Sequence, residues 1–221
     1  MKKFKFYFRK SSFKKDIKNG LRLLKLVNEF RPKNFLEIGV LEGVTSRNVC
    51  EQLHQINGGD FNFIGIDLFG DDLIKNNKKE FTPISYKINN PFKWFYFRVI
   101  LRMDPNSKEC VEYLLKKFKN AVKIFKGYSR DILEEINLKD IDFVFLDGGH
   151  SYSTVKNDLN LLTFKLKKNS IIVCDDYNIN HYGVKKAVDE IKNNYIFKDL
   201  GRFAFLKKKK IDVFNNNTNF K

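Results

Sequence analysis

The sequence has little cysteine, and the three residues present, Cys50, Cys110 and Cys174, form neither a disulfide framework nor a metal-binding pair. This scarcity favours a reduced, cytoplasmic protein. Long apolar runs are also missing, since none approaches the ~20 residues that a membrane-spanning helix requires. The basic, aromatic start over residues 1–10 is not followed by the apolar segment of a secretory signal peptide.

Acidic residues are scarce relative to basic ones: 26 Asp and Glu stand against 42 Lys and Arg, a formal charge of +16. Much of the excess lies near the two ends of the chain, in residues 1–30 and in the run Lys207–Lys210. This distribution favours a solvated basic surface, and nucleic acid is a less favoured partner. Contact of the basic start with an anionic membrane and homo-oligomerisation are further alternatives that the sequence leaves open.

The length of 221 residues is enough for one α/β domain with a full core. We expect a basic N-terminal arm and helix over residues 1–30, a main domain over 31–206, and a basic, flexible tail over 207–221. Apolar residues at helical spacing predict a helix over 12–30, capped by Ser11 or Ser12. The first ten residues are compatible with an edge strand, a dimer arm or a surface-binding arm.

Short apolar runs alternate with helical patterns through the rest of the chain. Strands are predicted at 34–40, 61–66, 121–125, 141–146 and 170–174, and helices at 45–55, 107–118, 153–166 and 183–193. A final antiparallel pair is expected at 195–200 and 203–206. This alternation predicts an α/β fold, a doubly wound, mostly parallel sheet with right-handed crossovers and helices on both faces.

The first predicted strand runs into a glycine turn, Glu37-Ile38-Gly39-Val40-Leu41-Glu42-Gly43. In such a turn Gly39 lets the backbone approach a ligand, and Gly43 lets the next helix pack close to the strand. The third glycine of the dinucleotide fingerprint is missing, which argues against a nicotinamide oxidoreductase. Asp67 ends the second predicted strand, where an acid is placed to accept hydrogen bonds from ribose hydroxyls. The alternative is a loop aspartate that caps the next element, and the glycine turn upstream favours the ribose role.

Residues 68–106 form a long insertion between core elements and contain the aromatic run 92–103. Insertions of this length are more often functional than idle. We consider three functional interpretations, namely a lid over the substrate, a partner surface or a membrane-interface segment. A helix packed on the core is an equally good structural explanation.

Three aspartates follow buried strands: Asp147 follows the fourth strand, and Asp175 and Asp176 follow the fifth. Because the carboxyl ends of parallel strands share one edge of a sheet, we expect these side chains to lie close together beside Gly39. Neighbouring carboxylates repel unless they are protonated or neutralised. A divalent cation with oxygen ligands, Mg²⁺ in the first place, is therefore expected at this edge. The alternative is that Asp176 caps the following segment and Asp175 accepts hydrogen bonds from backbone amides.

His150 lies three residues after Asp147, beyond two glycines that allow the chain to fold back toward that carboxylate. A neutral imidazole in this place is suited to act as a general base near pH 7. The other two histidines are better explained as exposed side chains, His54 on a helix flank and His181 in a loop.

Together these motifs resemble class I S-adenosylmethionine-dependent methyltransferases. Within that class they are most similar to the metal-dependent sugar O-methyltransferases related to macrocin and mycinamicin O-methyltransferase. The resemblance spans about residues 20–206, and the insertion at 68–106 and the basic start are unmatched. Five segments carry it: Glu37 to Gly43, Asp67, Gly127-Tyr128-Ser129, Asp147-Gly148-Gly149-His150-Ser151-Tyr152, and Cys174-Asp175-Asp176.

The resemblance implies a seven-stranded Rossmann-like sheet whose last strand is antiparallel, so residues 31–206 are expected to form a methyltransferase domain. It implies a divalent metal held by Asp147, Asp175 and Asp176, and a general base at His150. It also implies that S-adenosylmethionine is bound by residues at the strand ends: Glu37, Gly39, Gly43, Asp67, Ser129 and Asp147.

We therefore expect methyl transfer from S-adenosylmethionine to a hydroxyl of a sugar or a glycosylated small molecule. A catechol-type O-methyltransferase is one alternative, although such enzymes usually show Asp-Asn where this chain has Asp175-Asp176. A nucleic-acid methyltransferase would suit the charge, but enzymes that methylate nitrogen often carry Asn/Asp-Pro-Pro-Tyr where this chain has Asp147-Gly148-Gly149-His150. A non-catalytic partner scaffold is the third alternative, and the intact strand-end acids argue against it.

Overall fold

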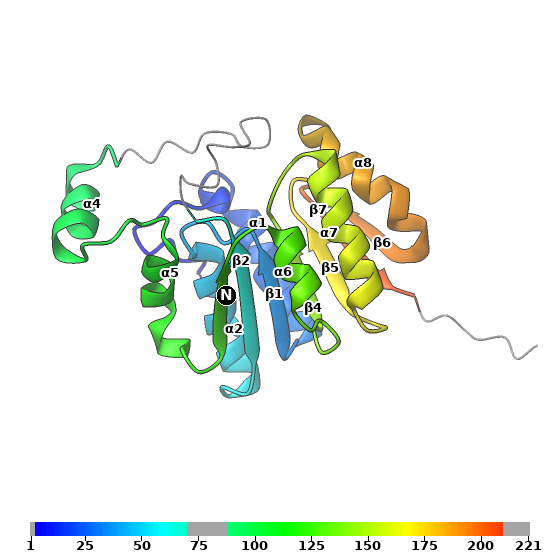
Figure 1. Cartoon of the computed structure of the whole chain (residues 1–221), viewed down its shortest axis with the longest axis horizontal. Helices are drawn as coiled ribbons and strands as arrows, with labels where there is room; N and C mark the ends of the chain where they lie inside the picture. The colour runs from blue at the N-terminus through cyan, green and yellow to red at the C-terminus, as the bar shows by residue number, and fades with distance from the viewer. Residues whose placement is uncertain (1–2, 70–87, 210–221) are drawn as a thin grey trace, which may run out of the picture.

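The computed structural model describes residues 3–69 and 88–209 (Figure 1). Residues 70–87 of the predicted insertion and residues 210–221 of the predicted tail lie outside the described residues. The described chain is built around one central sheet, and helices pack against both of its faces.

Seven strands form the sheet in the order β3-β2-β1-β4-β5-β7-β6. The strands are β1 Asn34–Ile38, β2 Asn62–Asp67, β3 Val122–Lys126, β4 Phe143–Leu146, β5 Ile171–Cys174, β6 Tyr195–Leu200 and β7 Phe203–Lys208. β1 to β5 pair in parallel, whereas β7 runs antiparallel to both β5 and β6. The sheet is therefore mixed, with β7 inserted between β5 and β6, and the prediction of seven strands with an antiparallel last strand is confirmed.

β1 is the point where the order of the strands switches: β2 and β3 lie on one side of it, and β4 and β5 lie on the other. Phe35 of β1 is in register with Phe63 of β2 and with Phe143 of β4. The rings stack at centroid distances of 5.7 and 5.2 Å. Open α/β sheets bind ligands at such a switch point, outside the carboxyl ends of the strands.

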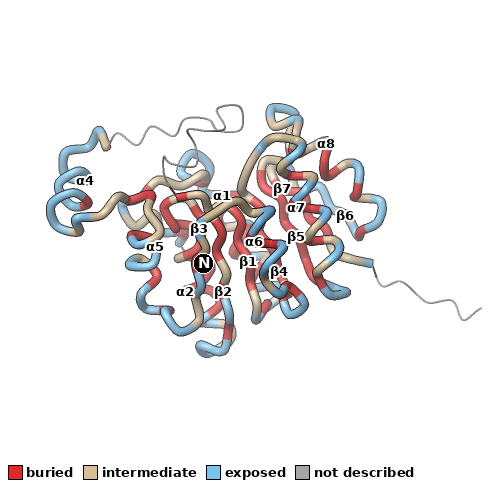
Figure 2. Tube along the Cα trace, viewed as in Figure 1, coloured by how far each residue is buried: buried red, intermediate tan, exposed pale blue. Residues whose placement is uncertain are grey.

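Two buried apolar layers hold the helices against the sheet (Figures 1 and 2). One face is covered by α1 Ile17–Phe30, α2 Val44–Asn57 and α5 Lys108–Leu115. The other face is covered by α6 Ser129–Glu135, α7 Tyr152–Lys165 and α8 Tyr182–Ile191. Strands that are buried on both faces have no polar side, which is why they appear in the sequence as continuous apolar runs.

The predicted strands and helices are all present, and their ends are shifted by a few residues. α1 begins after Asp16, whose side chain accepts a hydrogen bond from the Lys18 amide. The predicted cap of this helix at Ser11 or Ser12 is therefore wrong. Ser11 instead caps a single 3-10 turn, Ser12–Lys14, which precedes α1.

The basic start of the chain packs against the domain. Phe4 and Phe13 are buried, and their ring centroids lie 5.6 Å apart. Arg9 is also buried, and its guanidinium donates hydrogen bonds to the carbonyl oxygens of Glu42 and Cys110. No strand forms in residues 3–11, so the edge-strand interpretation is wrong.

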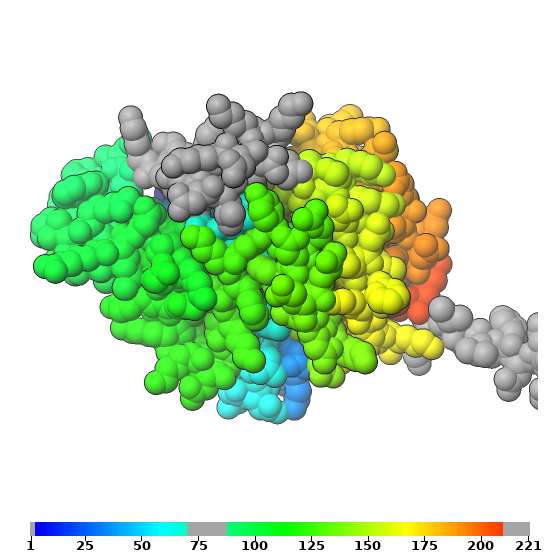
Figure 3. Space-filling view, viewed as in Figure 1, coloured from blue at the N-terminus to red at the C-terminus, as the bar shows by residue number. Residues whose placement is uncertain are grey.

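The described end of the insertion contains a short helix, α4 Pro91–Phe95, which continues into a π-helical turn, Tyr96–Ile100. This segment stands at one side of the molecule beyond α5 (Figures 1 and 3). Its inner side buries Phe97, while several large apolar side chains on its outer side are exposed. Within the described residues, no helix is long and apolar enough to cross a membrane.

Candidate functional site

The glycine turn after β1 brings two strands into close contact. Gly39 has a φ of +94°, and a Cβ at this position would lie 2.0 Å from the Asp147 carbonyl oxygen. Glycine is required there both for the backbone angle and for the space. Gly43 caps α2, and a Cβ on it would lie 3.0 Å from Val111 of α5. Gly43 therefore allows α2 to pack close to α5. The prediction that it lets the helix pack close to the strand is corrected.

Glu37 of β1 is completely buried next to the first turn of α2. Its Oε2 accepts a hydrogen bond from Ser46 Oγ at 2.6 Å, while its Oε1 has no partner among the described residues. Burial raises the pKa of Glu37 to about 8, and the bond from Ser46 opposes this shift. A buried acceptor without a donor is costly. A donor group on a bound ligand would satisfy Oε1, which is consistent with the predicted cofactor contact.

Asp67 ends β2 and holds the neighbouring loops through its side chain. Its Oδ2 accepts hydrogen bonds from the amides of Val40 at 2.7 Å and Leu41 at 2.8 Å, and its Oδ1 accepts one from Phe69 at 3.0 Å. Leu41 and Phe69 have φ values of 54° and 44°, which residues with a side chain rarely adopt. The carboxylate thus stabilises strained backbone at the carboxyl edge, and its contact with a ribose stays a prediction.

Ser129 begins α6 just after β3. Its hydroxyl lies 2.8 and 3.0 Å from the two carboxylate oxygens of Asp158, a buried residue of α7, and donates to them. The observed role of this side chain is to tie α6 to α7. Its predicted contact with the cofactor stays a prediction.

Three aspartates meet at the carboxyl ends of β4 and β5, as the order of the strands predicts. One carboxylate oxygen from each of Asp147, Asp175 and Asp176 lies within 4.8 Å of the other two. We call these three residues the acid cluster. Their convergence depends on the parallel pairing of β4 with β5, which ends both strands at the same edge.

A cation that sequence reasoning missed lies beside the acid cluster. Arg202, in the turn between β6 and β7, donates through Nε and Nη2 to the two oxygens of Asp175, each at 2.5 Å. Its Nη2 also lies 3.4 Å from Asp176 Oδ1. Bidentate pairs of this kind are among the stronger hydrogen-bonded ion pairs in proteins. The guanidinium therefore neutralises part of the negative charge of the cluster.

The three carboxyl groups differ in their electrostatic surroundings. Burial raises the pKa of Asp147 well above its usual range, and the charges of Asp175 and Asp176 add to this shift. Burial also raises the pKa of Asp175, although Arg202 opposes the change. Burial acts in the same sense on Asp176, but its hydrogen bond with His150 and the charge of Arg202 outweigh it and lower the pKa. The cluster thus combines groups that favour opposite protonation states.

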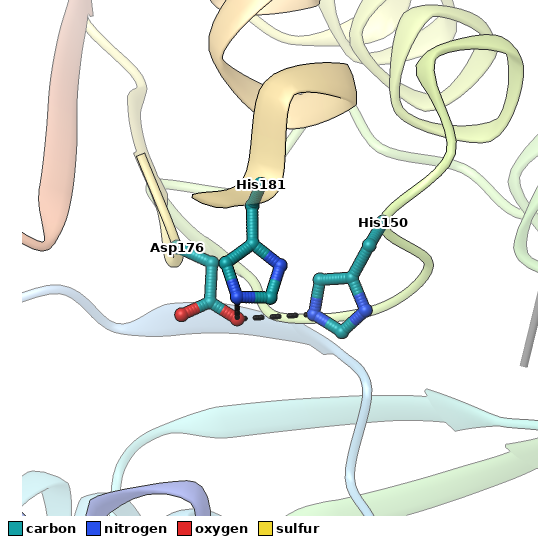
Figure 4. A group of neighbouring side chains, drawn as sticks. All are labelled: His150, Asp176 and His181. Carbon is teal, nitrogen blue, oxygen red and sulfur yellow. Dashed lines mark hydrogen bonds and ion pairs between the residues drawn. The ribbon is translucent and has the colours of Figure 1, made fainter. Parts of the chain in front are cut away.

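Two imidazoles face the same carboxylate oxygen (Figure 4). His150 Nε2 lies 3.0 Å from Asp176 Oδ2, and His181 Nε2 lies 3.7 Å from it. The start of α8 packs closely on the loop after β4, since a Cβ at Gly183 would lie 2.4 Å from the His150 carbonyl oxygen. The interpretation of His181 as an unrelated exposed loop residue is therefore corrected.

Comparison with known proteins identifies the family of this chain. The model of a methyltransferase domain matches residues 36–177, which run from β1 to the segment after β5. The chain belongs to this methyltransferase family. No curated protein sequence matches the chain.

Solved structures share the fold of this methyltransferase at low sequence identity. A putative caffeoyl-CoA O-methyltransferase from Staphylococcus aureus has 20% identity and a TM-score of 0.56, over 88% of this chain and 84% of that one. CalS11, a TDP-rhamnose 3'-O-methyltransferase of calicheamicin biosynthesis, has 16% identity and a TM-score of 0.58, over 89% and 81%. An O-methyltransferase from Bacillus cereus in complex with SAH has 12% identity and a TM-score of 0.59, over 90% and 84%. The predicted methyltransferase fold is confirmed.

The N-terminal segment of the methyltransferase reaches the acid cluster. Ser12 Oγ donates a hydrogen bond to Asp147 Oδ2 at 3.1 Å. The carbonyl oxygen of Ser12 accepts a hydrogen bond from Arg202 Nη1 at 3.3 Å. Segments from both ends of the domain therefore complete the site. Sequence reasoning missed Ser12 as well, because a single serine next to a turn carries no local signal of a contact 135 residues away.

The donor set of the acid cluster fits a hard divalent cation. Carboxylate oxygens are the ligands that Mg²⁺ prefers, and three aspartates supply them here. Arg202 already donates to both oxygens of Asp175. Each carboxylate oxygen has two lone pairs, so these oxygens retain acceptor capacity beside the guanidinium. A cation at this place would share Asp175 with Arg202 or displace it.

Proposed function

We propose that the protein is an S-adenosylmethionine-dependent O-methyltransferase that acts on a hydroxyl of a sugar or a glycosylated small molecule with the help of a divalent cation. The observation that carries the proposal is the meeting of the acid cluster with His150 beside the Gly39 turn. Doubly wound sheets bind their ligands at this edge. The acceptor class is supported by CalS11, a fold neighbour that is itself a TDP-rhamnose 3'-O-methyltransferase.

The half of the edge formed by β1 and β2 is assigned to the methyl donor. Glu37 offers a buried carboxylate oxygen that has no donor among the described residues. Gly39 holds the turn close to Asp147, and Asp67 fixes the backbone of that turn. S-adenosylmethionine carries an ammonium and a sulfonium, so carboxyl groups on this side favour its binding by charge. Gly43 and Ser129 are proposed to border the same ligand.

The half formed by β4 and β5 is assigned to the acceptor hydroxyl. Asp147, Asp175 and Asp176 are proposed to hold the divalent cation, which lowers the pKa of a neighbouring hydroxyl when it is bound. A small pocket beside the cluster is lined by Asp147, His150 and Asp175 together with the apolar side chains of Val155 and Val184. A pocket that combines a few polar side chains with apolar ones is suited to orient one hydroxyl of a small acceptor.

His150 is assigned as the general base. When its Nε2 donates to Asp176 Oδ2, its Nδ1 is left as the acceptor for the hydroxyl proton. Asp176 then orients the ring, as the third member of a nucleophile, base and carboxylate arrangement does. The acceptor oxygen forms its bond to the methyl carbon while the bond from that carbon to sulfur breaks, and His150 takes the proton.

A catechol-type acceptor is the second candidate, since the same residues would hold an aromatic diol, and a fold neighbour is a putative caffeoyl-CoA O-methyltransferase. Nucleic acid is favoured less. Two of the arginines, Arg9 and Arg202, are buried or half-buried in contacts within the domain and are not part of a basic surface.

Calorimetric titration with S-adenosylmethionine, followed by transfer assays on nucleotide sugars, catechols and RNA with and without EDTA, tests the proposal. We expect binding of the donor and EDTA-sensitive transfer to a nucleotide sugar. A protein that binds no S-adenosylmethionine would refute the donor assignment. Transfer to catechols or RNA alone would refute the acceptor class, and activity in EDTA would refute the role of the cation.

A further inference from the structure

A row of large apolar side chains faces solvent on the helical segment that follows the insertion. Phe92, Phe95, Tyr96, Val99 and Ile100 recur at intervals of three and four residues, which places them along one side of a helix. All five are exposed, and Phe92 is 80% exposed. We call this row the aromatic stripe. Helices on the surface of a domain usually turn such a row toward the core.

The orientation of the aromatic stripe is fixed by the opposite side of the same segment. Phe97 is completely buried there, between Lys93 Nζ at 5.6 Å and the Arg9 guanidinium at 5.1 Å from its ring centroid. Lys93 Nζ also pairs with Glu42 Oε2 at 3.1 Å, and both side chains are largely buried. The segment is therefore anchored to the domain through Lys93 and Phe97, and this anchoring turns the stripe outward.

Aromatic and cationic residues adjoin the aromatic stripe. Phe8 of the N-terminal arm lies with its ring centroid 6.5 Å from that of Tyr96. Trp94 is 50% exposed on the same segment but lies off the stripe, two residues from Phe92 and from Tyr96. Arg98 and Arg102 are exposed, and Arg98 Nη2 pairs with Asp104 Oδ2 at 2.7 Å just beyond the segment. Trp and Tyr favour the interface between water and a bilayer, and Lys and Arg are attracted to anionic lipid head groups.

We propose that the aromatic stripe docks on the surface of an anionic lipid bilayer. The exposed apolar row would insert at the level of the head groups, and Arg102 would face the lipid phosphates. The protein has a net charge of +16, which adds a long-range attraction to such a surface. This inference differs from contact through the basic start, because that start is packed into the fold by Phe4, Arg9 and Phe13.

A second copy of the chain fits the aromatic stripe less well. In a symmetric pair the same patch meets itself, so the arginines beside the stripe would approach the same arginines of the other copy. A stable dimer buries about 800 Å² on each partner. Five side chains on ten residues of projecting helix are a small part of such an interface, whereas a bilayer contact needs no matching surface.

The chain contains one tryptophan, Trp94, which is two residues from both Phe92 and Tyr96 and therefore lies off the aromatic stripe. The reporter variant Trp94→Phe with Val99→Trp places the single tryptophan on the stripe. Vesicles of equal parts phosphatidylcholine and phosphatidylglycerol should shift the tryptophan emission of the reporter variant to shorter wavelength, and brominated acyl chains should quench it. Vesicles of phosphatidylcholine alone should bind more weakly, and added salt should weaken binding to the anionic ones. An emission spectrum that anionic vesicles leave unchanged would overturn the proposal. If the emission shifts to shorter wavelength as the protein concentration rises without lipid, and light scattering gives twice the mass of one chain, the stripe binds a second copy and the proposal is overturned.

A double variant, Phe92→Ser with Phe95→Ser, should lower the partition coefficient on anionic vesicles about tenfold or more, because two large apolar side chains no longer insert. The matched control is Phe164→Ser on α7, which removes a phenylalanine that is 86% exposed elsewhere on the surface. This control should bind as the unaltered protein does. Equal weakening by both changes would overturn the proposal. Circular dichroism and donor binding verify that each variant is folded.

Discussion

The two halves of the carboxyl edge hold their acids in different ways. On the β2 side, Asp67 is bonded to three backbone amides, those of Val40, Leu41 and Phe69. On the β4 and β5 side, Asp147 accepts a hydrogen bond from the Ser12 side chain. Among the described residues, Asp175 accepts two from the Arg202 side chain and only one from a backbone amide, that of Asp176. A carboxylate held by backbone amides is part of the scaffold, whereas one held by side chains changes partners by a rotation of those chains. The second half is therefore the one built to exchange a ligand.

The strongest test of this comparison is His150→Ala, because the change touches the β4 and β5 half alone. Turnover should fall by about 10²- to 10⁴-fold, the usual contribution of a general base. The affinity for S-adenosylmethionine should stay nearly the same, since the donor is assigned to the other half. Calorimetry and initial rates measure the two effects. His54→Ala on α2 is the control, and full activity in the His150 variant would remove the base assignment.

Arg202→Gln removes the cation that the acid cluster contacts most closely. Without divalent metal, the unfolding free energy should fall by about 3–5 kcal/mol, because buried carboxyl groups lose their partner. Added Mn²⁺ should restore part of this loss and should bind more tightly than to the unaltered protein, because the guanidinium no longer competes for Asp175. Denaturant titration and electron paramagnetic resonance of Mn²⁺ measure these effects.

Arg31→Gln, an exposed residue at the end of α1 that contacts the Ile56 carbonyl oxygen, is the control for Arg202→Gln. It removes the same charge from a residue that lies outside the acid cluster. If both variants bind Mn²⁺ with the affinity of the unaltered protein, the idea that Arg202 and a metal compete for Asp175 is wrong.

Glu37→Gln tests the β1 half through the pH dependence of stability. The pKa of Glu37 is about 8 in the folded protein and 4.5 ordinarily, so between these values the folded state binds more protons than the unfolded state. The unfolding free energy of the unaltered protein therefore falls as the pH rises from about 4.5 to about 8. The full shift corresponds to at most about 5 kcal/mol at about 1.4 kcal/mol per unit.

The glutamine variant lacks this titration, so its stability should depend less on pH and should exceed that of the unaltered protein above pH ~8. Denaturation at about pH 5 and about pH 9 provides the measurement. Above pH ~8, where Glu37 is ionised, the variant should also bind S-adenosylmethionine more weakly, because the negative charge assigned to the donor is lost. A variant that is less stable at the higher pH would contradict the raised pKa.

Ser12→Ala should have the smallest effect. It removes one hydrogen bond to Asp147, which contributes about 0.5–1.5 kcal/mol to stability. Combining it with Asp147→Asn in a double-mutant cycle isolates the pair from other effects of either change. Additive losses in that cycle would show that the contact contributes nothing.

Much of the fold follows from local patterns in the sequence. Apolar runs that end in Gly39, Asp67, Asp147 and Asp175 predict the strands, and alternation with helices predicts that these ends share one edge. The convergence of the acid cluster follows from that order alone. The resemblance of the motifs to known methyltransferases adds the antiparallel last strand, which the pairing of β7 confirms.

The partners of the acids do not follow from the sequence. Arg202 is one of 42 basic residues and stands in an ordinary hairpin turn. Ser12 precedes the domain core, and His181 lies in a 3-10 turn whose position against His150 depends on the packing of Gly183. Each contact joins elements that only the tertiary structure brings together. The contact of Asp67 with the Phe69 amide fits the capping alternative, whereas its contacts with the amides of Val40 and Leu41 depend on the path of the turn after β1.

The hairpin that carries Arg202 is synthesised last among the elements of the site. A nascent chain that has just passed Asp176 already contains the candidate general base and the whole acid cluster, but the guanidinium that pairs with Asp175 lies 27 residues further on. Until β6 and β7 emerge from the ribosome and pair, these carboxyl groups lack their strongest neutralising partner. Synthesis of the β6–β7 hairpin and assembly of a charge-compensated site are therefore coupled, and a product terminated before Arg202 would retain the motifs while failing to hold them together.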